Sequence, residues 1–154
     1  MRRLSGLLVA GAIMLLPAFS QGHGSVSAQG QALTFDGDTA IITVAIKPDK
    51  TAEFEQIMAD VRAALMKSEK PERKQQAAGW KVVKSATPMK DGNIVYMHVI
   101  SPVVKGADYT ILTILYEGTA DAAAQRAIFE KYKETFAAAL GGGAFTTVVD
   151  LSKP

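Results

Sequence analysis

The stretch that decides the fold is WKVVKSATPMKDGNIVYMHVI, residues 80–100. Its two arms, residues 80–85 and 93–100, are rich in β-branched and aromatic side chains, which favour strands. Residues 88–93 predict the turn between them, because an Asp-Gly pair readily adopts left-handed backbone conformations. The stretch therefore predicts an antiparallel hairpin. Alternation along its second strand places one set of side chains on a single face: Ile94, Tyr96, His98 and Ile100.

Upstream of the hairpin, the sequence predicts a strand followed by two helices. Residues 40–46, AIITVAI, are β-branched nearly throughout and precede Pro48, which indicates a central strand with both faces at least partly covered. The next apolar residues recur at the spacing of an amphipathic helix: Phe54, Ile57, Met58, Val61 and Leu65. Residues 72–78 predict a short second helix, which Gly79 would end.

Downstream of the hairpin, two further helices and a last strand are expected. Residues 109–116 combine β-branched content with helical spacing, and we favour a helix. A long helix is then predicted from a second apolar stripe made of Ile128, Phe129, Tyr132, Phe136 and Leu140. The glycine triplet at residues 141–143 would end this helix. Residues 144–151 would form the last strand.

The expected order of elements defines the fold class. Strand, helix, strand, strand, helix and strand is the ferredoxin-like βαββαβ arrangement of the α+β class. In this arrangement a four-stranded antiparallel sheet carries its helices on one face. The other face of this apolar sheet needs cover of its own, so we expect a homodimer that packs sheet against sheet, as in a dimeric α+β barrel.

The N-terminal segment has the pattern of an export signal. Arg2 and Arg3 precede an apolar run of 16 residues, 4–19, and small residues follow it. We expect residues 1–28 to be a signal peptide cleaved before Gln29, with cleavage after residue 20 as the alternative. The competing interpretation is an uncleaved membrane anchor, for which the run is short. Cleavage would leave a periplasmic or secreted protein that has no membrane segment.

The expected mature chain divides into two parts. Residues 29–38 would be a flexible segment or a short hairpin, and residues 39–151 a single α+β domain. The 154-residue chain has 17 Lys and Arg against 15 Asp and Glu, and Arg2 and Arg3 account for the whole surplus. The mature domain would thus be neutral, which argues against nucleic acid as a partner. Residues 67–74 alternate basic and acidic side chains and indicate a solvated helix face.

Two segments carry a resemblance to a known superfamily. Residues 73–80, RKQQAAGW, and residues 102–109, PVVKGADY, together with the order of elements, resemble an exported bacterial branch of the dimeric α+β barrel superfamily. This superfamily includes antibiotic-biosynthesis-monooxygenase-like and stress-responsive barrel proteins. The resemblance covers most of residues 39–150. It implies a homodimer whose cleft between helices and sheet takes small aromatic or haem-like molecules, and it transfers no catalytic residue.

Four side chains are candidates for contact with a ligand: Trp80, Tyr96, His98 and Tyr109. The competing interpretation is that each one fills the core or an interface. His98 would be the single histidine of the mature chain, and it is the candidate general acid and base or haem ligand. The opposite interpretation is a histidine with a hydrogen-bonded role at the sheet face. The sequence places no catalytic partner beside it.

Other site chemistries lack support in the sequence. The chain has no cysteine, which excludes disulfides, thiolate zinc sites and cysteine nucleophiles. No serine elbow or paired-histidine motif is present, and the glycine triplet lacks the order of a phosphate-binding loop. We therefore expect no metal site and no cofactor, with haem as the alternative.

Three functions remain open at this point. The first is a non-catalytic exported homodimer that binds a small apolar or aromatic ligand. The second is a monooxygenase-like or haem-associated oxidoreductase that uses His98, and the third is a protein-interaction module of the cell envelope. A pocket that contains His98 would favour the enzyme, an apolar pocket without titratable groups would favour binding, and a filled cleft would favour the interaction module.

Overall fold

The structure is a computed structural model that describes residues 32–152, so the predicted signal peptide and residues 29–31 lie outside the described part. The elements in chain order are β1 (Thr39–Ile46), the 3-10 turn η1 (Pro48–Lys50), α1 (Thr51–Lys67), α2 (Pro71–Gly79), β2 (Trp80–Lys84), β3 (Ile94–Ile100), α3 (Ile111–Tyr116), α4 (Ala122–Thr135) and β4 (Phe136–Phe145). Among the described helices, none combines the length and apolar character that a membrane crossing requires.

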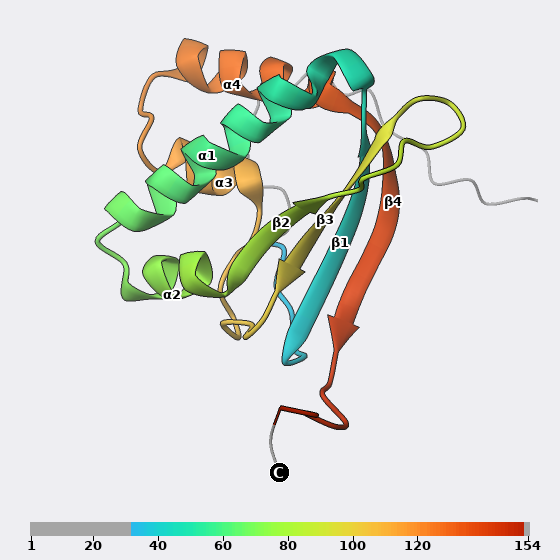
Figure 1. Ribbon diagram of the computed structural model, residues 1–154. Coiled ribbons are helices and arrows are strands. Elements are labelled where there is room, and N and C mark those ends of the chain that lie inside the picture. The colour runs from blue at the N-terminus through green and yellow to red at the C-terminus, as the bar shows by residue number, and fades with distance from the viewer. Residues whose placement is uncertain (1–31, 153–154) are drawn as a thin grey trace, which may run out of the picture.

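The fold class is confirmed as α+β and ferredoxin-like. The four strands form one antiparallel sheet in the order β2-β3-β1-β4, and the helices pack on one face of it (Figure 1). The predicted hairpin of β2 and β3 is present, with Val82 opposite His98. The helix favoured over residues 109–116 is also present, as α3.

The core lies between the sheet and its helices. The predicted stripe of α1 is buried at Phe54, Ile57, Val61 and Leu65. The Phe54 ring meets the Tyr96 ring of β3 edge to face, with centroids 4.8 Å apart. Tyr96, His98 and Ile100 are each at most 2% exposed, which confirms the predicted alternation of β3.

The C-terminal third corrects the predicted boundaries. The second long helix ends at Thr135 rather than at the glycine triplet, and the chain continues directly into β4. Phe136, Leu140 and residues 141–143 therefore lie on a strand, not on a helix. Of residues 144–151, predicted as the last strand, only the first two belong to β4.

Pairing with β1 explains this error. An alanine-rich segment favours a helix when isolated, but here β1 would otherwise lack its second hydrogen-bonded neighbour. Small side chains allow β4 to lie close to β1, since a Cβ on Gly142 would collide with the backbone of Ile41. Gly141 has a φ of +107° at a register irregularity opposite Thr43 and Val44, which glycine tolerates. Tertiary pairing thus overrides local helix propensity.

The segment before β1 also differs from the expected hairpin. Residues 32–36 form no strand, and the segment instead binds the loop before α3. The Tyr109 amide donates to the Leu33 carbonyl at 2.8 Å, and the Leu33 amide donates to Asp108 Oδ1 at 2.9 Å. The Phe35 ring lies 5.5 Å from the Tyr109 ring. The backbone amide and carbonyl of Leu33 therefore form hydrogen bonds with a loop that is distant in sequence, rather than with the adjacent strand β1.

No described helix covers the face of the sheet opposite α1 to α4 (Figure 1). By alternation its central strands present Ile41 and Thr43 from β1 and Val95, Met97 and Val99 from β3. None of these residues belongs to the three buried clusters of the described chain. We call this surface the open face.

Candidate functional site

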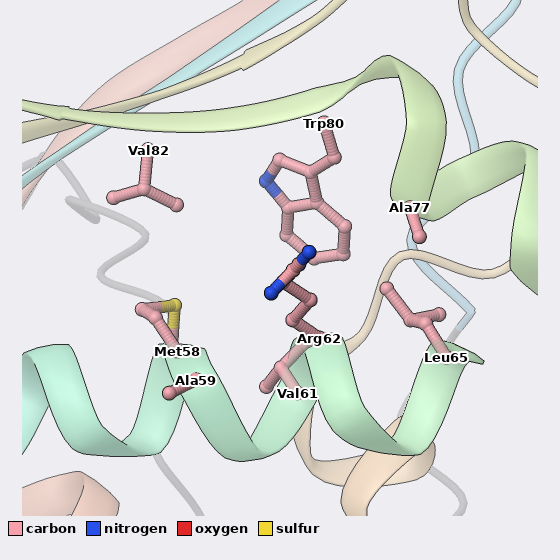
Figure 2. Close-up of a pocket in the computed structure, with 8 residues that line it drawn as sticks. All are labelled: Met58, Ala59, Val61, Arg62, Leu65, Ala77, Trp80 and Val82. Carbon is pink, nitrogen blue, oxygen red and sulfur yellow. The ribbon is translucent and has the colours of Figure 1, made fainter. Parts of the chain in front are cut away.

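An apolar cavity of about 290 Å³ lies where α1 and the end of α2 approach the edge strand β2 (Figure 2). Eight residues line it: Met58, Ala59, Val61, Arg62, Leu65, Ala77, Trp80 and Val82. Seven of these side chains are uncharged and largely apolar, and Arg62 is the exception. The volume is just below the range of about 300–1,000 Å³ that is typical of small-molecule sites.

A second cavity, also about 290 Å³, adjoins the first. Met58 of α1 and Val82 of β2 line both, so the two hollows are neighbours along the same helix and strand. The remaining lining residues of the second cavity are Phe54, Glu55, Lys84 and Tyr96. We call the two cavities together the α1–β2 groove.

Alternation along β2 explains why a groove forms at this edge. Trp80, Val82 and Lys84 share the face that turns toward α1, because they pair with Ile100, His98 and Tyr96 on the helix-covered face of β3. Val82 is 37% exposed although it lies on that face. The helices therefore leave part of the edge strand uncovered, and an apolar strip remains accessible.

The second cavity ends in a polar cluster. The Tyr96 hydroxyl donates to Glu55 Oε1 at 2.6 Å, and Lys84 Nζ donates to the same oxygen at 2.9 Å. The hydrogen bond from Tyr96, followed by that from Lys84, lowers the pKa of Glu55. The carboxylate is therefore charged at neutral pH and its two donors are already engaged with it.

A hydrogen bond to His98 fixes the orientation of the Trp80 side chain. The indole Nε1 donates to His98 Nδ1 at 3.2 Å, and the imidazole is 2% exposed. Burial lowers the pKa of His98 from 6.5 to about 4, so the ring is neutral at pH 7. With Nδ1 accepting, its proton resides on Nε2. His98 lines neither cavity, and its direct partner is the tryptophan that does.

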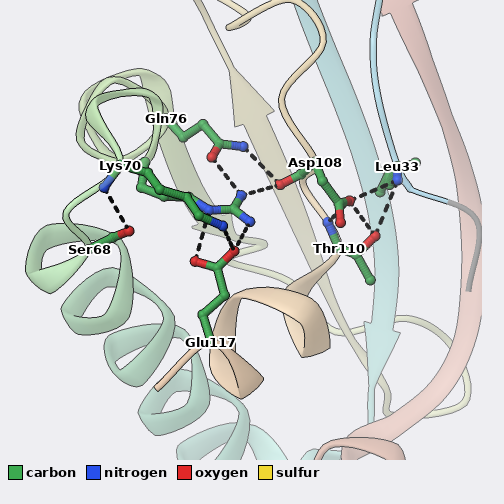
Figure 3. Close-up of polar contacts among 8 residues, drawn as sticks. Leu33, Ser68, Lys70, Gln76, Asp108, Thr110 and Glu117 are labelled. Atoms are coloured by element: carbon green, nitrogen blue, oxygen red, sulfur yellow. Dashed lines mark hydrogen bonds and ion pairs between the residues drawn. The ribbon is translucent and has the colours of Figure 1, made fainter. Parts of the chain in front are cut away.

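A buried arginine fixes the helix that leads into Trp80. Arg73 of α2 is 5% exposed, which corrects the solvated face predicted for this basic run. Its Nη1 donates to Gln76 Oε1 at 2.8 Å and also to the Asp108 carbonyl. Its Nε and Nη2 donate to Glu117, and the bond from Arg73 is the main cause that lowers the Glu117 pKa. Figure 3 shows Gln76, Asp108 and Glu117 converging at this point.

The two segments quoted above for the resemblance pack against each other. The Ser101 amide donates to the Gly79 carbonyl at 2.8 Å. A Cβ on Gly79 would lie 2.6 Å from the Pro102 carbonyl oxygen, so this contact requires glycine. The ring centroids of Trp80 and Tyr109 are 5.4 Å apart. Residues 73–80 and 102–109 therefore form one structural unit that places the indole beside the groove.

The four candidate residues separate into two groups. Trp80 and Tyr96 line the groove, whereas His98 and Tyr109 lie behind it. Tyr109 is 1% exposed, and its hydroxyl accepts a hydrogen bond from the Val104 amide at 2.9 Å. Tyr109 is therefore a core residue that supports Trp80.

Sequence reasoning missed the part of the groove that α1 supplies. Met58 belongs to the predicted core stripe of this helix, and Arg62 lies outside that stripe, but both line the first cavity. The available signal was Val82, because an apolar residue on the same face of the predicted strand as Trp80 needs cover from a helix. The sequence does not say how far α1 extends over that strand.

The described residues bear on two kinds of cofactor, a metal ion and a haem held by His98. Within residues 32–152, no group of three or more His, Asp or Glu side chains could hold a metal ion. A haem held by His98 would need an imidazole nitrogen facing a cavity. His98 lines neither cavity of the groove and its Nδ1 is bonded to Trp80, so the arrangement does not fit that group.

In comparisons with known proteins, no family model, no curated protein and no solved structure matches the chain. The resemblance to the dimeric α+β barrel superfamily rests on the order of elements and the two quoted segments. What it implies for function is therefore a proposal.

Proposed function

We propose that the chain is an exported, homodimeric domain that binds a small apolar or aromatic molecule in the α1–β2 groove. The observation that carries this proposal is a preformed apolar cavity beside Trp80 whose described lining includes no histidine and no carboxylate. A rigid aromatic side chain gives a planar ligand a large contact area. The indole is already oriented by His98 and the ring of Tyr109.

Binding without catalysis agrees best with the titratable groups near the groove. Glu55, Tyr96 and Lys84 satisfy one another, so none is poised as a free acid or base. His98 could act on a ligand only after the indole had moved away. The groove is also open rather than filled, which favours a ligand site over an interaction module.

Homodimer formation is supported by the open face. Its β-branched and methionine side chains would be buried if two sheets packed together, at about 25 cal/mol per Å² of apolar area removed from water. The ligand groove lies on the opposite, helix-bearing side of the sheet. A second copy on the open face would therefore leave the groove accessible.

The ligand site is tested with the neutral fluorophore N-phenyl-1-naphthylamine, whose emission rises in apolar surroundings. Trp80 is the sole tryptophan of the chain, so energy transfer from it reports bound probe. Ala59 is exposed and lines the first cavity, and Ala59→Phe should fill that cavity without changing the core. The matched control is Ala127→Phe, at an exposed position of α4.

We expect saturable binding by the wild type and the control, and a loss of about tenfold or more in affinity for Ala59→Phe. The proposal is wrong if the wild type shows no saturable binding. It is also wrong if Ala59→Phe binds the probe as tightly as Ala127→Phe does.

A further inference from the structure

We propose that the molecule bound in the α1–β2 groove is an anion with an apolar body, and that Arg62 binds its acidic group. This inference rests on the proposed function and adds the ligand's chemical class to it. The relevant chemistry is a carboxylate, sulfonate or similar oxyanion attached to an aromatic or aliphatic frame. Arg62 is the one charged side chain in the lining of the first cavity.

The first argument is that Arg62 differs from two other cations of the helix-bearing side, which are already paired with carboxylates. Lys84 pairs with Glu55, and Arg73 pairs with Glu117. Among the described residues, no carboxylate lies within ion-pair distance of Arg62 and no acceptor bonds to it. The guanidinium therefore keeps its donors available for an anion.

The second argument is the position of Arg62 relative to the apolar surface. Figure 2 shows the Arg62 side chain extending from α1 toward β2. The Trp80 indole extends from β2 toward α1 in the same part of the cavity. In the described chain, the cations that lie over aromatic rings are Lys84 and Lys133, so Arg62 is not engaged in a contact of that kind. A guanidinium at the border of an apolar hollow suits a ligand with an acidic group and an apolar body.

The third argument is the geometry of recognition. A guanidinium presents its N–H donors in a planar fork that fits two oxygens of a carboxylate or sulfonate. The polar cluster of Glu55, Tyr96 and Lys84 at the other end is internally satisfied and leaves no spare cation. The acidic group is therefore assigned to the Arg62 end.

The test compares two probes that differ by one acidic group. They are 8-anilinonaphthalene-1-sulfonate, which is an anion, and the neutral N-phenyl-1-naphthylamine. Their affinities are measured at low salt for the wild type, Arg62→Gln and Arg62→Lys. The matched control is Arg126→Gln, which removes an exposed arginine of α4 that lines neither cavity. Circular dichroism verifies that each variant is folded.

We expect Arg62→Gln to weaken binding of the anionic probe about tenfold, in keeping with loss of a charged hydrogen bond. Binding of the neutral probe should stay within about twofold, and Arg62→Lys should keep only part of the anion's affinity, because the charge remains but the planar fork of donors is lost. Arg126→Gln should change neither affinity. Added salt should weaken the anion's binding to the wild type more than to Arg62→Gln.

Other outcomes separate this inference from the proposed function. If the wild type binds the neutral probe and Arg62→Gln leaves both affinities unchanged, the groove binds apolar molecules but the anion is not recognised by Arg62. If Arg62→Gln weakens both probes equally, Arg62 acts through packing and the inference is wrong. If the wild type binds neither probe, the proposed function fails as well.

Discussion

The two faces of the sheet are built from the same strands but differ in what covers them. The helix-bearing face holds large aromatic and branched side chains, such as Phe136 and Tyr96, which pack around Phe54 of α1. The open face presents Ile41, Thr43 and Met97 without a described helix above them. Within the described residues, one face is thus covered by helices and the other is not.

This difference is the basis of the two proposed binding surfaces. On the covered face, the helices stop short of the edge strand, and an apolar groove remains beside Trp80. On the open face, the surface is broad and apolar, which suits a second sheet better than a small ligand. Because neighbouring residues of a strand belong to opposite faces, a substitution can change one face and leave the other unchanged.

The largest expected effect comes from the centre of the covered face. Phe54 is fully buried, with its ring against Tyr96 and Phe136, and Phe54→Ala should reduce the free energy of unfolding by about 4 kcal/mol. The control is Val83→Ala, at a position that is 46% exposed on the other side of β2, where a change of about 0.5 kcal/mol is expected. Urea denaturation measures both. Equal losses for the two variants would remove the proposed difference between the faces.

The next effect concerns the buried arginine that supports Trp80. Arg73→Met should lower the free energy of unfolding by about 3 kcal/mol, because Gln76 and the Asp108 carbonyl lose their charged donor. Lys74→Met removes an exposed cation from the same helix and should change stability by under about 0.5 kcal/mol. Trp80 fluorescence should also shift to the red in Arg73→Met, as the indole loses its fixed position. An unchanged unfolding curve for Arg73→Met would contradict the structural role.

A smaller effect arises from His98, which titrates differently in the folded and unfolded chains. Its pKa is about 4 when folded and 6.5 in the reference state, so between these values the unfolded chain binds a proton that the folded chain does not. The contribution of His98 to the free energy of unfolding is therefore complete above pH 6.5, and it decreases as the pH falls toward 4. The contribution should amount to about 2 kcal/mol between pH 8 and pH 5.

His98→Gln isolates this contribution, because glutamine can still accept a hydrogen bond from the indole but does not titrate. The variant should lose less stability than the wild type over the same pH range, and binding of the neutral probe should persist at pH 7. Identical pH dependence in the two proteins would show that the imidazole is accessible to protons in the folded state. Loss of probe binding with folding intact would instead favour direct contact of His98 with the ligand.

Met97→Lys should have the smallest effect on the stability of the single chain. It is also the most direct test of dimer formation through the open face. Met97 lies on β3 with its side chain opposite the helix-bearing face, so a lysine there can stay solvated in a monomer. Light scattering should report about twice the chain mass for the wild type and a single chain for the variant. The thermal midpoint should rise with protein concentration only in the wild type. A wild type that remains monomeric at high micromolar concentration would contradict the proposed dimer.

Much of the fold could be predicted because its signals are local. The Asp-Gly turn and the alternation of β3 indicated the hairpin, and the stripe from Phe54 to Leu65 indicated α1. The boundary at Thr135 was missed, because the alanines after it favour a helix until β1 offers backbone partners. The binding of Leu33 by the loop before α3 likewise depends on a residue that is distant in sequence.

The candidate site could be predicted only in part. Trp80 and Tyr96 were recognised as aromatic side chains on the helix-facing side of the hairpin. Arg73 and Arg62 were not, because their roles depend on where α1 and α2 lie over the sheet. In sequence both belong to ordinary mixed-charge helix faces. In the fold, one is buried among acceptors and the other lines an apolar cavity.

The central claim is that the covered face binds a small molecule while the open face binds a second chain. Native mass spectrometry of the protein purified from its own source tests both parts in one measurement. The account predicts a dimer of chains that begin near Gln29, together with the added mass of a small organic molecule that is released on unfolding. A single chain without added mass, under conditions that preserve known weak dimers and their ligands, would contradict it.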